Sequence, residues 1–247
     1  MGNKFFKKIR LFLFLLAITL GVGGSVLVVM AGTNLHSFSA VTDGGQPYGA
    51  LTYVTSSTTF YGMTSVGGTN EFGTLFSLAD GVYTSLHHFG AKSDGATPRG
   101  SLLFVEGHNK LYGMTSAGGA NSCGVIFSYD LNPENLTPYN ILHSFDGGLE
   151  AEALGIGGCT PYGSLVYDAG GDLFYGMTNL GGETNQGTLF SLSGDGGTYT
   201  RLLSFGGDNA GVYPVDSLIY TGGKLVGMTS AGGTYGNGVL FTLDGSS

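Results

Sequence analysis

The residues of this chain that could do chemistry are acidic side chains recurring at similar places. Asp43, Asp94, Asp146 and Asp208 stand near the starts of four similar segments, which read SAVTDGGQP, GAKSDGATP, DGGLEAEALGIGGCTP and GGDNAGVYP. A ring of such carboxylates could bind a cation or a polar ligand. The simpler alternative is that each Asp caps its own turn through a hydrogen bond to the backbone. The sequence leaves both alternatives open.

A second set of carboxylates breaks the repeated pattern. The third segment contains the insert LEAEALGIGG, with Glu150 and Glu152, and Asp216 stands where the related words have Gly. Function is often found where a loop leaves the pattern of its scaffold. Two carboxyl groups about 5–10 Å apart across a glycosidic bond could hydrolyse a polysaccharide. The candidates for such a pair are Asp146, Glu150, Glu152, Asp208 and Asp216.

Other residue types give fewer leads. Tyr48, Arg99 and Tyr162 each follow a proline beside the acidic segments, and aromatic rings together with carboxylates suit a sugar. The histidines of the repeated LHSF words, one per unit, cannot converge on one ion as a metal site requires, so we expect no metal. The chain has no GxSxG, HExxH or CxxC motif, so no catalytic residue and no cofactor are predicted.

The elements that position these residues come from an internal repeat. Four words recur in fixed order, and their copies begin at the following residues. The words are LHSF (Leu35, Leu86, Leu142 and, as LLSF, Leu202), PYGSL (Pro47, Pro98, Pro161, Pro214), YGMT (Tyr61, Tyr112, Tyr175, Val226) and GTLFSL (Gly73, Gly124, Gly187, Gly238). Each word is a short run of apolar, aromatic and β-branched residues bounded by turn residues, which predicts a strand. One unit is therefore four antiparallel strands in about fifty residues.

Such units predict an all-β fold, a β-propeller of four four-stranded blades, because stacked sheets cover strands that are apolar on both faces. The first LHSF word is left over, and the last unit lacks one. If residues 35–38 complete the last blade, the ring closes and removes its open edges. The competing interpretation is half of an eight-bladed ring formed by a dimer. We name the segments 39–47, 90–98, 146–161 and 206–214 the linking loops, and 67–73, 118–124, 181–187 and 232–238 the glycine loops.

The glycine loops lack the features of a phosphate site. They read GGTNEFG, GGANSCG, GGETNQG and GGTYGNG, and none opens a helix or is followed by Lys-Ser/Thr. We interpret them as structural turns. The Gly of YGMT lies inside a strand, and we expect it to leave room for an aromatic ring of the next blade.

The repeat words resemble a known family. LYGMTSAGGANSCGVIF (residues 111–127) is similar to the repeat of the GloVer family (Gloeobacter/Verrucomicrobia-type tandem repeats), whose units read roughly as LYGTT-S-GG followed by G-G-TVF. Met63, Met114, Met177 and Met228 stand where the family usually has Thr. The resemblance implies a secreted bacterial surface protein, and it implies no particular reaction.

The N-terminus predicts export. Residues 1–10 contain Lys4, Lys7, Lys8 and Arg10, and an uncharged apolar run follows to Ala31. This is the pattern of a signal peptide, although the run is nearly long enough for a retained membrane anchor. We therefore expect residues 1–31 to be a signal peptide or anchor, residues 32–247 to be the propeller, and the protein to be extracytoplasmic.

The remaining part is strongly acidic. Without residues 1–31, five basic and seventeen acidic residues leave a net charge of −12, which makes nucleic acid an improbable partner. Propeller topology places linking and glycine loops on one face, where they rim the central funnel. Cys123 of the second glycine loop and Cys159 of the third linking loop then lie on adjacent blades, and an exported protein can keep a disulfide between them.

Two functions fit these observations. The first is a non-catalytic, secreted or cell-surface binding module for a glycan or a protein, expected to be a monomer. The second is a polysaccharide-active hydrolase or lyase that uses carboxylates at the funnel.

Overall fold

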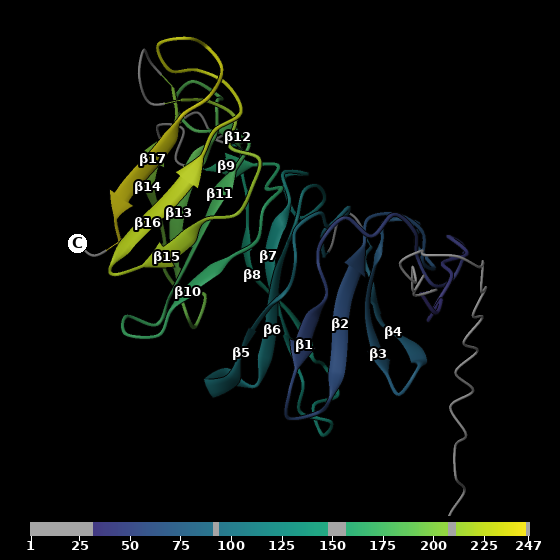
Figure 1. Cartoon of the computed structure of the whole chain (residues 1–247). Helices are drawn as coiled ribbons and strands as arrows, with labels where there is room; N and C mark the ends of the chain where they lie inside the picture. The colour runs from purple at the N-terminus through teal and green to yellow at the C-terminus, as the bar shows by residue number, and fades with distance from the viewer. Residues whose placement is uncertain (1–31, 91–93, 148–156, 207–210, 246–247) are drawn as a thin grey trace, which may run out of the picture. The chain divides into compact units, whose positions relative to one another are not determined.

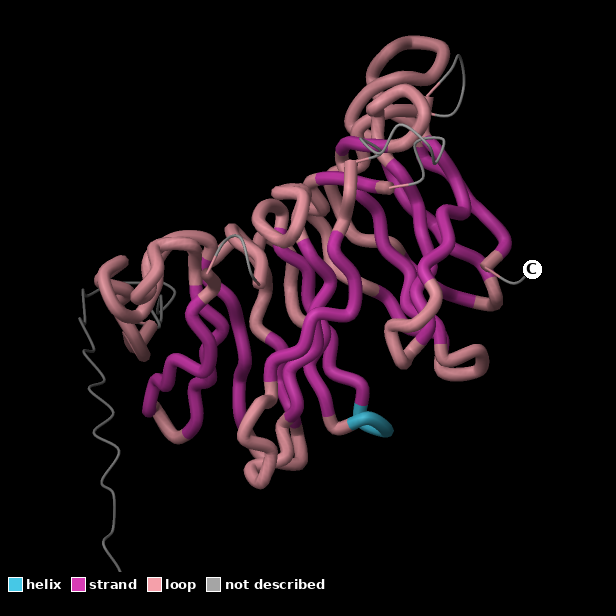
Figure 2. The backbone as a smooth tube through the Cα atoms, turned by 180° about the vertical axis from the view of Figure 1, so that it is seen from behind, coloured by secondary structure: helices cyan, strands magenta, loops and turns pink. Residues whose placement is uncertain are grey.

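Short antiparallel strands make up almost all of the regular structure. The computed structural model describes residues 32–90, 94–147, 157–206 and 211–245. Apart from one helical turn, η1 (Glu106–His108), every regular element in these ranges is a strand, as Figure 2 shows. No helix within the described ranges is both long and apolar enough to cross a bilayer. The expected export segment, residues 1–31, lies outside them.

The chain divides into two units, Met1–Leu35 and His36–Ser247, and the sheets belong to the second. Its strands form four principal sheets, numbered here in chain order (Figure 1). Sheet 1 contains β1 (Thr52–Val54), β2 (Thr59–Thr64), β3 (Thr74–Ala79) and β4 (Val82–His88). Sheet 2 contains β5 (Leu103–Val105), β6 (Lys110–Thr115), β7 (Val125–Asp130) and β8 (Tyr139–Ser144). Sheet 3 contains β10 (Val166–Asp168), β11 (Leu173–Thr178), β13 (Thr188–Ser193) and β14 (Tyr199–Ser204). Sheet 4 contains β15 (Ile219–Thr221), β16 (Lys224–Met228) and β17 (Leu240–Asp244).

Within each sheet, strands adjacent in sequence are paired antiparallel, so the predicted all-β fold of repeated sheets is confirmed. The third and fourth strands of sheets 1, 2 and 3 pair with the same irregularity, for example between Leu75 and Phe76. An additional two-stranded pairing joins β9 (Gly158–Cys159) to β12 (Leu180–Gly181).

The core lies between successive sheets. One apolar cluster joins sheets 1 and 2, a second joins sheets 2 and 3, and a third joins sheets 3 and 4. The first cluster unites Met63 and Leu75 of sheet 1 with Leu102 and Leu111 of sheet 2, all of them buried. Because each sheet is covered by its neighbour, the arrangement is propeller-like.

The glycine inside each second strand has a different reason from the expected one. A Cβ at Gly62 would lie 2.6 Å from the ring of Phe76 and 2.9 Å from Leu51. Phe76 is the residue paired with Gly62 on the neighbouring strand of the same sheet. The expectation of a ring from the next blade was therefore wrong: the glycine makes room for a ring that crosses its own sheet.

The expected closure of the ring is not seen. Sheet 4 has three strands in the described part of the chain, and residues 32–39 form none. Instead, the ring of His36 stacks on Tyr83 of sheet 1 with centroids 4.0 Å apart, and Phe38 contacts Phe76 at 5.4 Å. These aromatic contacts hold the segment against sheet 1, and no pairing with β17 accompanies them.

Candidate functional site

Three side chains that directly follow consecutive linking loops form a stack. Tyr48, Arg99 and Tyr162 each follow the proline that ends a linking loop. The guanidinium carbon of Arg99 lies 5.2 Å from the ring centroid of Tyr48 and 5.0 Å from that of Tyr162. Both distances fall within the roughly 6 Å range of cation–π attraction. The structure thus brings together the three rim residues that the sequence suggested.

Glycines fix this stack by letting the inner backbones approach closely. A Cβ at Gly49 would lie 2.2 Å from the carbonyl oxygen of Gly100, and one at Gly100 would lie 2.1 Å from that of Gly163. The amide of Ser101 also donates to the hydroxyl of Ser164 at 2.8 Å. The three stacked residues immediately precede these glycines, so the spacing of the sheets sets the spacing of the rings.

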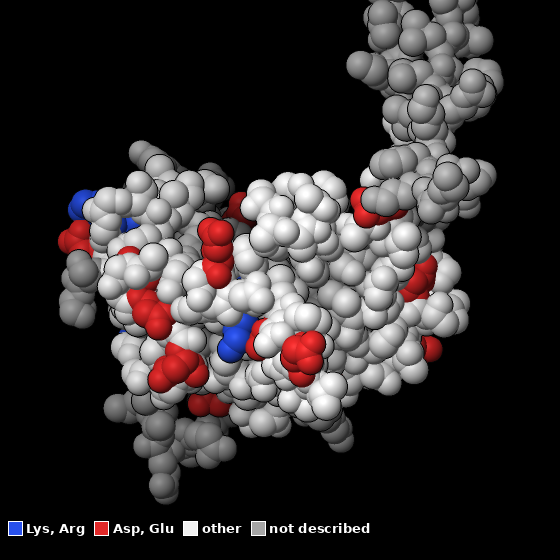
Figure 3. Space-filling model, turned by 90° about the horizontal axis from the view of Figure 1, so that it is seen from below, with Lys and Arg blue, Asp and Glu red and all other residues white. Residues whose placement is uncertain are grey.

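Arg99 is the exposed cation of this stack. Among the residues that the structure describes, no carboxylate lies within ion-pair distance of Arg99, whereas Arg201 pairs with Glu183 and Lys224 with Asp244. A guanidinium carries five N–H donors in a fixed plane. A cation–π contact uses the charge of the guanidinium and not its N–H groups, so these donors remain available to an oxygen-rich or anionic group. On the face that Figure 3 shows, acidic side chains are spread among uncharged ones, in keeping with the acidic composition.

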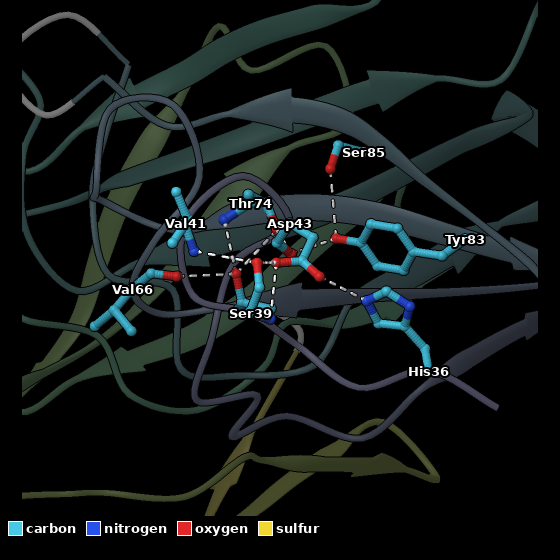
Figure 4. A network of polar contacts seen from close by, with 9 residues as sticks. His36, Ser39, Val41, Asp43, Val66, Thr74, Tyr83 and Ser85 are labelled. Atoms are coloured by element: carbon cyan, nitrogen blue, oxygen red, sulfur yellow. Dashed lines mark hydrogen bonds and ion pairs between the residues drawn. The ribbon is translucent and has the colours of Figure 1, made fainter. Parts of the chain in front are cut away.

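The recurring Asp residues have a role inside their own loops, shown for the first copy in Figure 4. His36 Nε2 lies 2.9 Å from Asp43 Oδ2, and the Ser39 amide donates to Asp43 Oδ1 at 2.9 Å. The Tyr83 hydroxyl donates to the Asp43 carbonyl oxygen at 2.5 Å. Hydrogen bonds, foremost from the Ser39 hydroxyl, lower the pKa of the Asp43 carboxyl. The carboxylate therefore holds its own loop together, while the Asp43 carbonyl oxygen ties the loop to Tyr83 of sheet 1.

The second copy repeats this cluster. His87 Nε2 lies 2.7 Å from Asp94 Oδ2, the Gly90 amide donates to Asp94 Oδ1, and His87 stacks on Tyr139 with centroids 3.9 Å apart. Burial lowers the pKa of His87, while Asp94 acts in the opposite direction. Recurrence of the same contacts favours the turn-capping interpretation of these Asp residues over a ring of carboxylates around a ligand.

The third copy keeps the stack and varies the loop. His143 stacks on Tyr199 at 4.0 Å, and burial lowers the pKa of His143 while Asp146 raises it. The Asp146 carboxylate lies against Gly157, where a Cβ would come within 1.3 Å of Oδ1. Any side chain at residue 157 would therefore displace this carboxylate.

The remaining carboxylates give no observed pair. Glu150, Glu152 and Asp208 lie outside the described residues, and exposed Asp216 accepts a hydrogen bond from the Ser217 amide at 2.7 Å. Within the described ranges, no three His, Cys, Asp or Glu side chains are grouped as a metal site would need. A carboxylate pair for polysaccharide hydrolysis stays a prediction.

Linking loops also pair with the residue just before the glycine loop of the sheet they lead into, through backbone bridges such as Gly45–Val66 and Ala96–Ala117. The amide of Thr160 donates to the carbonyl of Cys123 in the preceding sheet's glycine loop, at 2.9 Å. A disulfide joins Cys123 to Cys159, whose Cα atoms are 4.5 Å apart. The covalent bond thus reinforces a junction between sheets 2 and 3 that backbone hydrogen bonds already make.

Comparison with known proteins agrees with this repeated construction. The model of the Gloeobacter/Verrucomicrobia repeat matches residues 25–241. The chain belongs to the Gloeobacter/Verrucomicrobia repeat family. The family resemblance of the repeat words is thereby confirmed.

Other comparisons are more distant. No curated protein matches the chain. A solved structure from Agrobacterium tumefaciens, assigned as TolB, is similar with a TM-score of 0.48 and 12% identity. The similarity covers 83% of this chain and 66% of the other, so the chain spans just under two thirds of that protein's length.

In this Gloeobacter/Verrucomicrobia repeat, the Thr of YGMT organises the glycine loop. Thr64 is fully buried, its hydroxyl lies 2.9 Å from that of Thr74, and it accepts the Thr74 amide at 3.0 Å. Thr178 and Thr188 repeat the hydroxyl contact at 2.8 Å. These bonds join the two ends of the glycine loop and agree with the expected structural turn.

The sequence interpretation missed the tyrosine partners of the repeated histidines. Tyr83 and Tyr139 precede His87 and His143 by four residues, in YTSLH and YNILH. That spacing was a usable signal, because each Tyr receives the His of the preceding copy.

A further polar cluster concerns His108, which has no repeat equivalent. His108 Nδ1 lies 2.7 Å from the Tyr112 hydroxyl, and Nε2 lies 3.3 Å from Asp172 Oδ1. Burial raises the pKa of Tyr112 to about 12. The cluster joins Tyr112 on β6 of sheet 2 to Asp172, the residue before β11 of sheet 3.

Proposed function

We propose that this protein is a non-catalytic binding module of the cell surface, and that its ligand, a glycan or a protein, contacts the stack of Tyr48, Arg99 and Tyr162. The observation that carries the proposal is the exposed Arg99 guanidinium held between two rings, with no carboxylate at ion-pair distance among the described residues. Tyr48 is 59% exposed, so its ring is accessible as well.

A saccharide suits this arrangement chemically. Aromatic rings offer apolar faces for C–H groups of a sugar, and a guanidinium donates to hydroxyl or carboxylate oxygens in a fixed plane. The stack is built by backbone contacts between sheets, so it is preorganised and costs little ordering on binding. Family membership supports a repeat module and names no reaction.

Location is part of the proposal. The basic and apolar pattern of residues 1–31 supports export, and the Cys123–Cys159 disulfide is of the kind that persists outside the reducing cytoplasm. We propose that the protein is secreted or anchored at the outer side of the cytoplasmic membrane.

The test is a glycan array together with polysaccharide-turnover assays on the full chain. For any glycan that binds, Arg99→Gln should weaken binding about tenfold or more, since a charge-assisted hydrogen bond contributes roughly 1.5–3 kcal/mol. Lys224→Gln is the matched control, because it removes one exposed positive charge far along the sequence from the stack. If Arg99→Gln and Lys224→Gln bind the glycan equally well, the stack of Tyr48, Arg99 and Tyr162 is not the binding site.

Turnover separates the alternative function. A non-catalytic module binds without consuming the polysaccharide. Consumption that is abolished by Asp216→Asn would establish the hydrolase or lyase instead.

A further inference from the structure

The chain builds the same junction between sheets three times, always from the same two sets of positions. We call the face of a sheet that packs on the following sheet its forward face, and the opposite face its backward face. The forward face contributes the Met of YGMT and the first apolar residue of GTLFSL, which are Met63 and Leu75 in sheet 1. The backward face of the next sheet contributes Leu102 and Leu111. All four side chains are at most 5% exposed.

The forward face of sheet 4 carries the same residue types without cover. Met228 and Leu240 are the equivalents of Met63 and Leu75, and they are 53% and 73% exposed. In sheet 3, Met177 is 4% exposed. Within the described part of the chain, the forward face of sheet 4 is therefore an apolar junction surface that meets no following sheet.

The backward face of sheet 1 is uncovered in the complementary way. Leu51 and Phe60 are the equivalents of Leu102 and Leu111, and they are 53% and 40% exposed. Sheets 1 and 4 lie on opposite sides of sheets 2 and 3 in both Figure 1 and Figure 2. Each uncovered face thus presents the half of a junction that the other lacks.

The segment at residues 36–38 adds a second, independent match. His87 makes two contacts: it stacks on Tyr139 of the following sheet, and it pairs with Leu75 on β3 of its own sheet. His36 makes the first contact by stacking on Tyr83, and residues 32–39 form no strand. The equivalent of Leu75 in sheet 4 is Leu240 on β17. In the described residues no fourth strand pairs with the outer edge of β17.

We propose that a second copy of this chain covers these faces head to tail, so that sheet 4 of one copy packs on sheet 1 of the other. The segment 35–38 of the second copy, whose His36 and Phe38 already contact that copy's sheet 1, then becomes the fourth strand beside β17. The repeat register pairs His36 of one copy with Leu240 of the other. Each junction joins two different faces, and two copies joined at both faces would be related by a twofold axis and would make a closed ring of eight sheets, within the roughly four to eight of known propellers.

One position distinguishes this junction from the internal ones. At the inner edge of each internal junction a glycine, such as Gly163, lets the next backbone approach: a Cβ there would lie 2.3 Å from the backbone oxygen of Asp216. Asp216 is the equivalent residue of sheet 4, and it has a side chain. The innermost backbones of the two copies must therefore stay further apart than those within one copy. Replacing Asp216 by Gly should tighten the association.

The direct test is a cysteine pair in the full chain, purified in a mild detergent because its N-terminal segment is apolar. Copies carrying both His36→Cys and Leu240→Cys should form a dimer-sized disulfide product under mild oxidation. The matched control is Leu240→Cys with Val82→Cys. Val82 is 65% exposed and begins β4, whereas His87, the repeat equivalent of His36, lies near the end of that strand. A monomer-sized cross-link would show closure within one chain, and no cross-link would show no junction; either result overturns the proposal.

Sedimentation tests the same surface without cross-linking. Leu240→Asp should raise the dimer dissociation constant about 100- to 10,000-fold, because a dimer closed at both faces loses one buried apolar side chain at each of its two junctions, and each loss contributes about 10- to 100-fold. Leu136→Asp, which changes a residue that is 93% exposed and outside both faces, should leave it unchanged. Asp216→Gly should lower it. A wild-type chain that remains monomeric at all concentrations, or a Leu240→Asp variant that associates like wild type, would overturn the proposal.

Discussion

Substituting Gly100 by Ala tests whether the close backbone approach at the inner edge of the sheets is required. The added Cβ would lie 2.1 Å from the carbonyl oxygen of Gly163, 2.7 Å from its carbonyl carbon and 3.2 Å from the Ser164 nitrogen. All three atoms belong to the backbone, so no side-chain rotation can relieve the overlap. Sheets 2 and 3 must move apart, and the apolar cluster between them must loosen.

The expected cost follows from overpacking. Inserting one methyl group into a well-packed site costs about 1–3 kcal/mol, and a backbone obstacle places this case near 3 kcal/mol. For a chain of this size, 1 kcal/mol shifts the melting temperature by roughly 2–4 °C. Gly100→Ala should therefore lower it by about 6–12 °C.

Gly107→Ala is the matched control. Nothing lies within 4 Å of a Cβ at Gly107, and its φ is not positive. The same chemical change there should raise stability by about 0.4–1 kcal/mol, because it restricts the unfolded chain. Calorimetry and urea unfolding of the full chain measure both variants. If Gly100→Ala melts within 2 °C of Gly107→Ala, the backbone contact is not what holds the inner edge.

Three further predictions use other parts of the structure. Burial lowers the pKa of His87 below its ordinary value of 6.5, so the unfolded state binds more protons and stability should fall as the pH drops through about 6.5; urea unfolding should show a smaller fall for His87→Gln. Reducing Cys123–Cys159, 36 residues apart, should cost roughly 3–4 kcal/mol, and an unchanged urea midpoint would contradict this. Leu75→Ala should lower the free energy of unfolding by about 2–5 kcal/mol, because Leu75 is fully buried. Leu240→Ala, studied at concentrations where the chain is monomeric, should lower it by under about 1 kcal/mol. Equal losses for the two variants would mean that the forward face of sheet 4 is covered in the monomer.

The sequence allowed the repeated sheets to be predicted because the strand words recur with their turns. Four copies of YGMT and GTLFSL gave the order of strands in every sheet, and the positions of Cys123 and Cys159 in that order placed them on adjacent sheets. Local pattern and turn residues suffice for such features, since they depend on short-range geometry.

Contacts between different units were harder to predict. Gly62 was assigned to a ring of the next blade, although the ring belongs to Phe76 on the paired strand. Ring closure was inferred from the order of words, but word order does not say whether residues 35–38 reach sheet 4 of the same chain. Ring closure depends on the angle between sheets, and the contact of Gly62 depends on how the Phe76 ring lies across its own sheet; no single word encodes either.

The candidate site was predicted in part. Tyr48, Arg99 and Tyr162 were grouped by their place after a proline, and their rings and guanidinium do meet. The pairing of His87 with Asp94 could not be predicted from the words, because it depends on how the linking loop folds back toward the end of β4 and brings together residues seven apart in sequence.

The docking of each fourth-strand histidine on the following sheet has a consequence for how such proteins can be recombined. A unit cut at the boundary of a sheet would lose the His and Phe that cover the next sheet, and would expose a tyrosine such as Tyr139. The tyrosine and the histidine of one fourth strand stack on different partners, since Tyr139 receives His87 whereas His143 stacks on Tyr199. A transplantable unit should therefore begin inside a fourth strand, after its tyrosine, and end with the tyrosine of the next fourth strand, as residues 84–139 would. Chimeras joined in that frame keep each histidine–tyrosine stack within one parent.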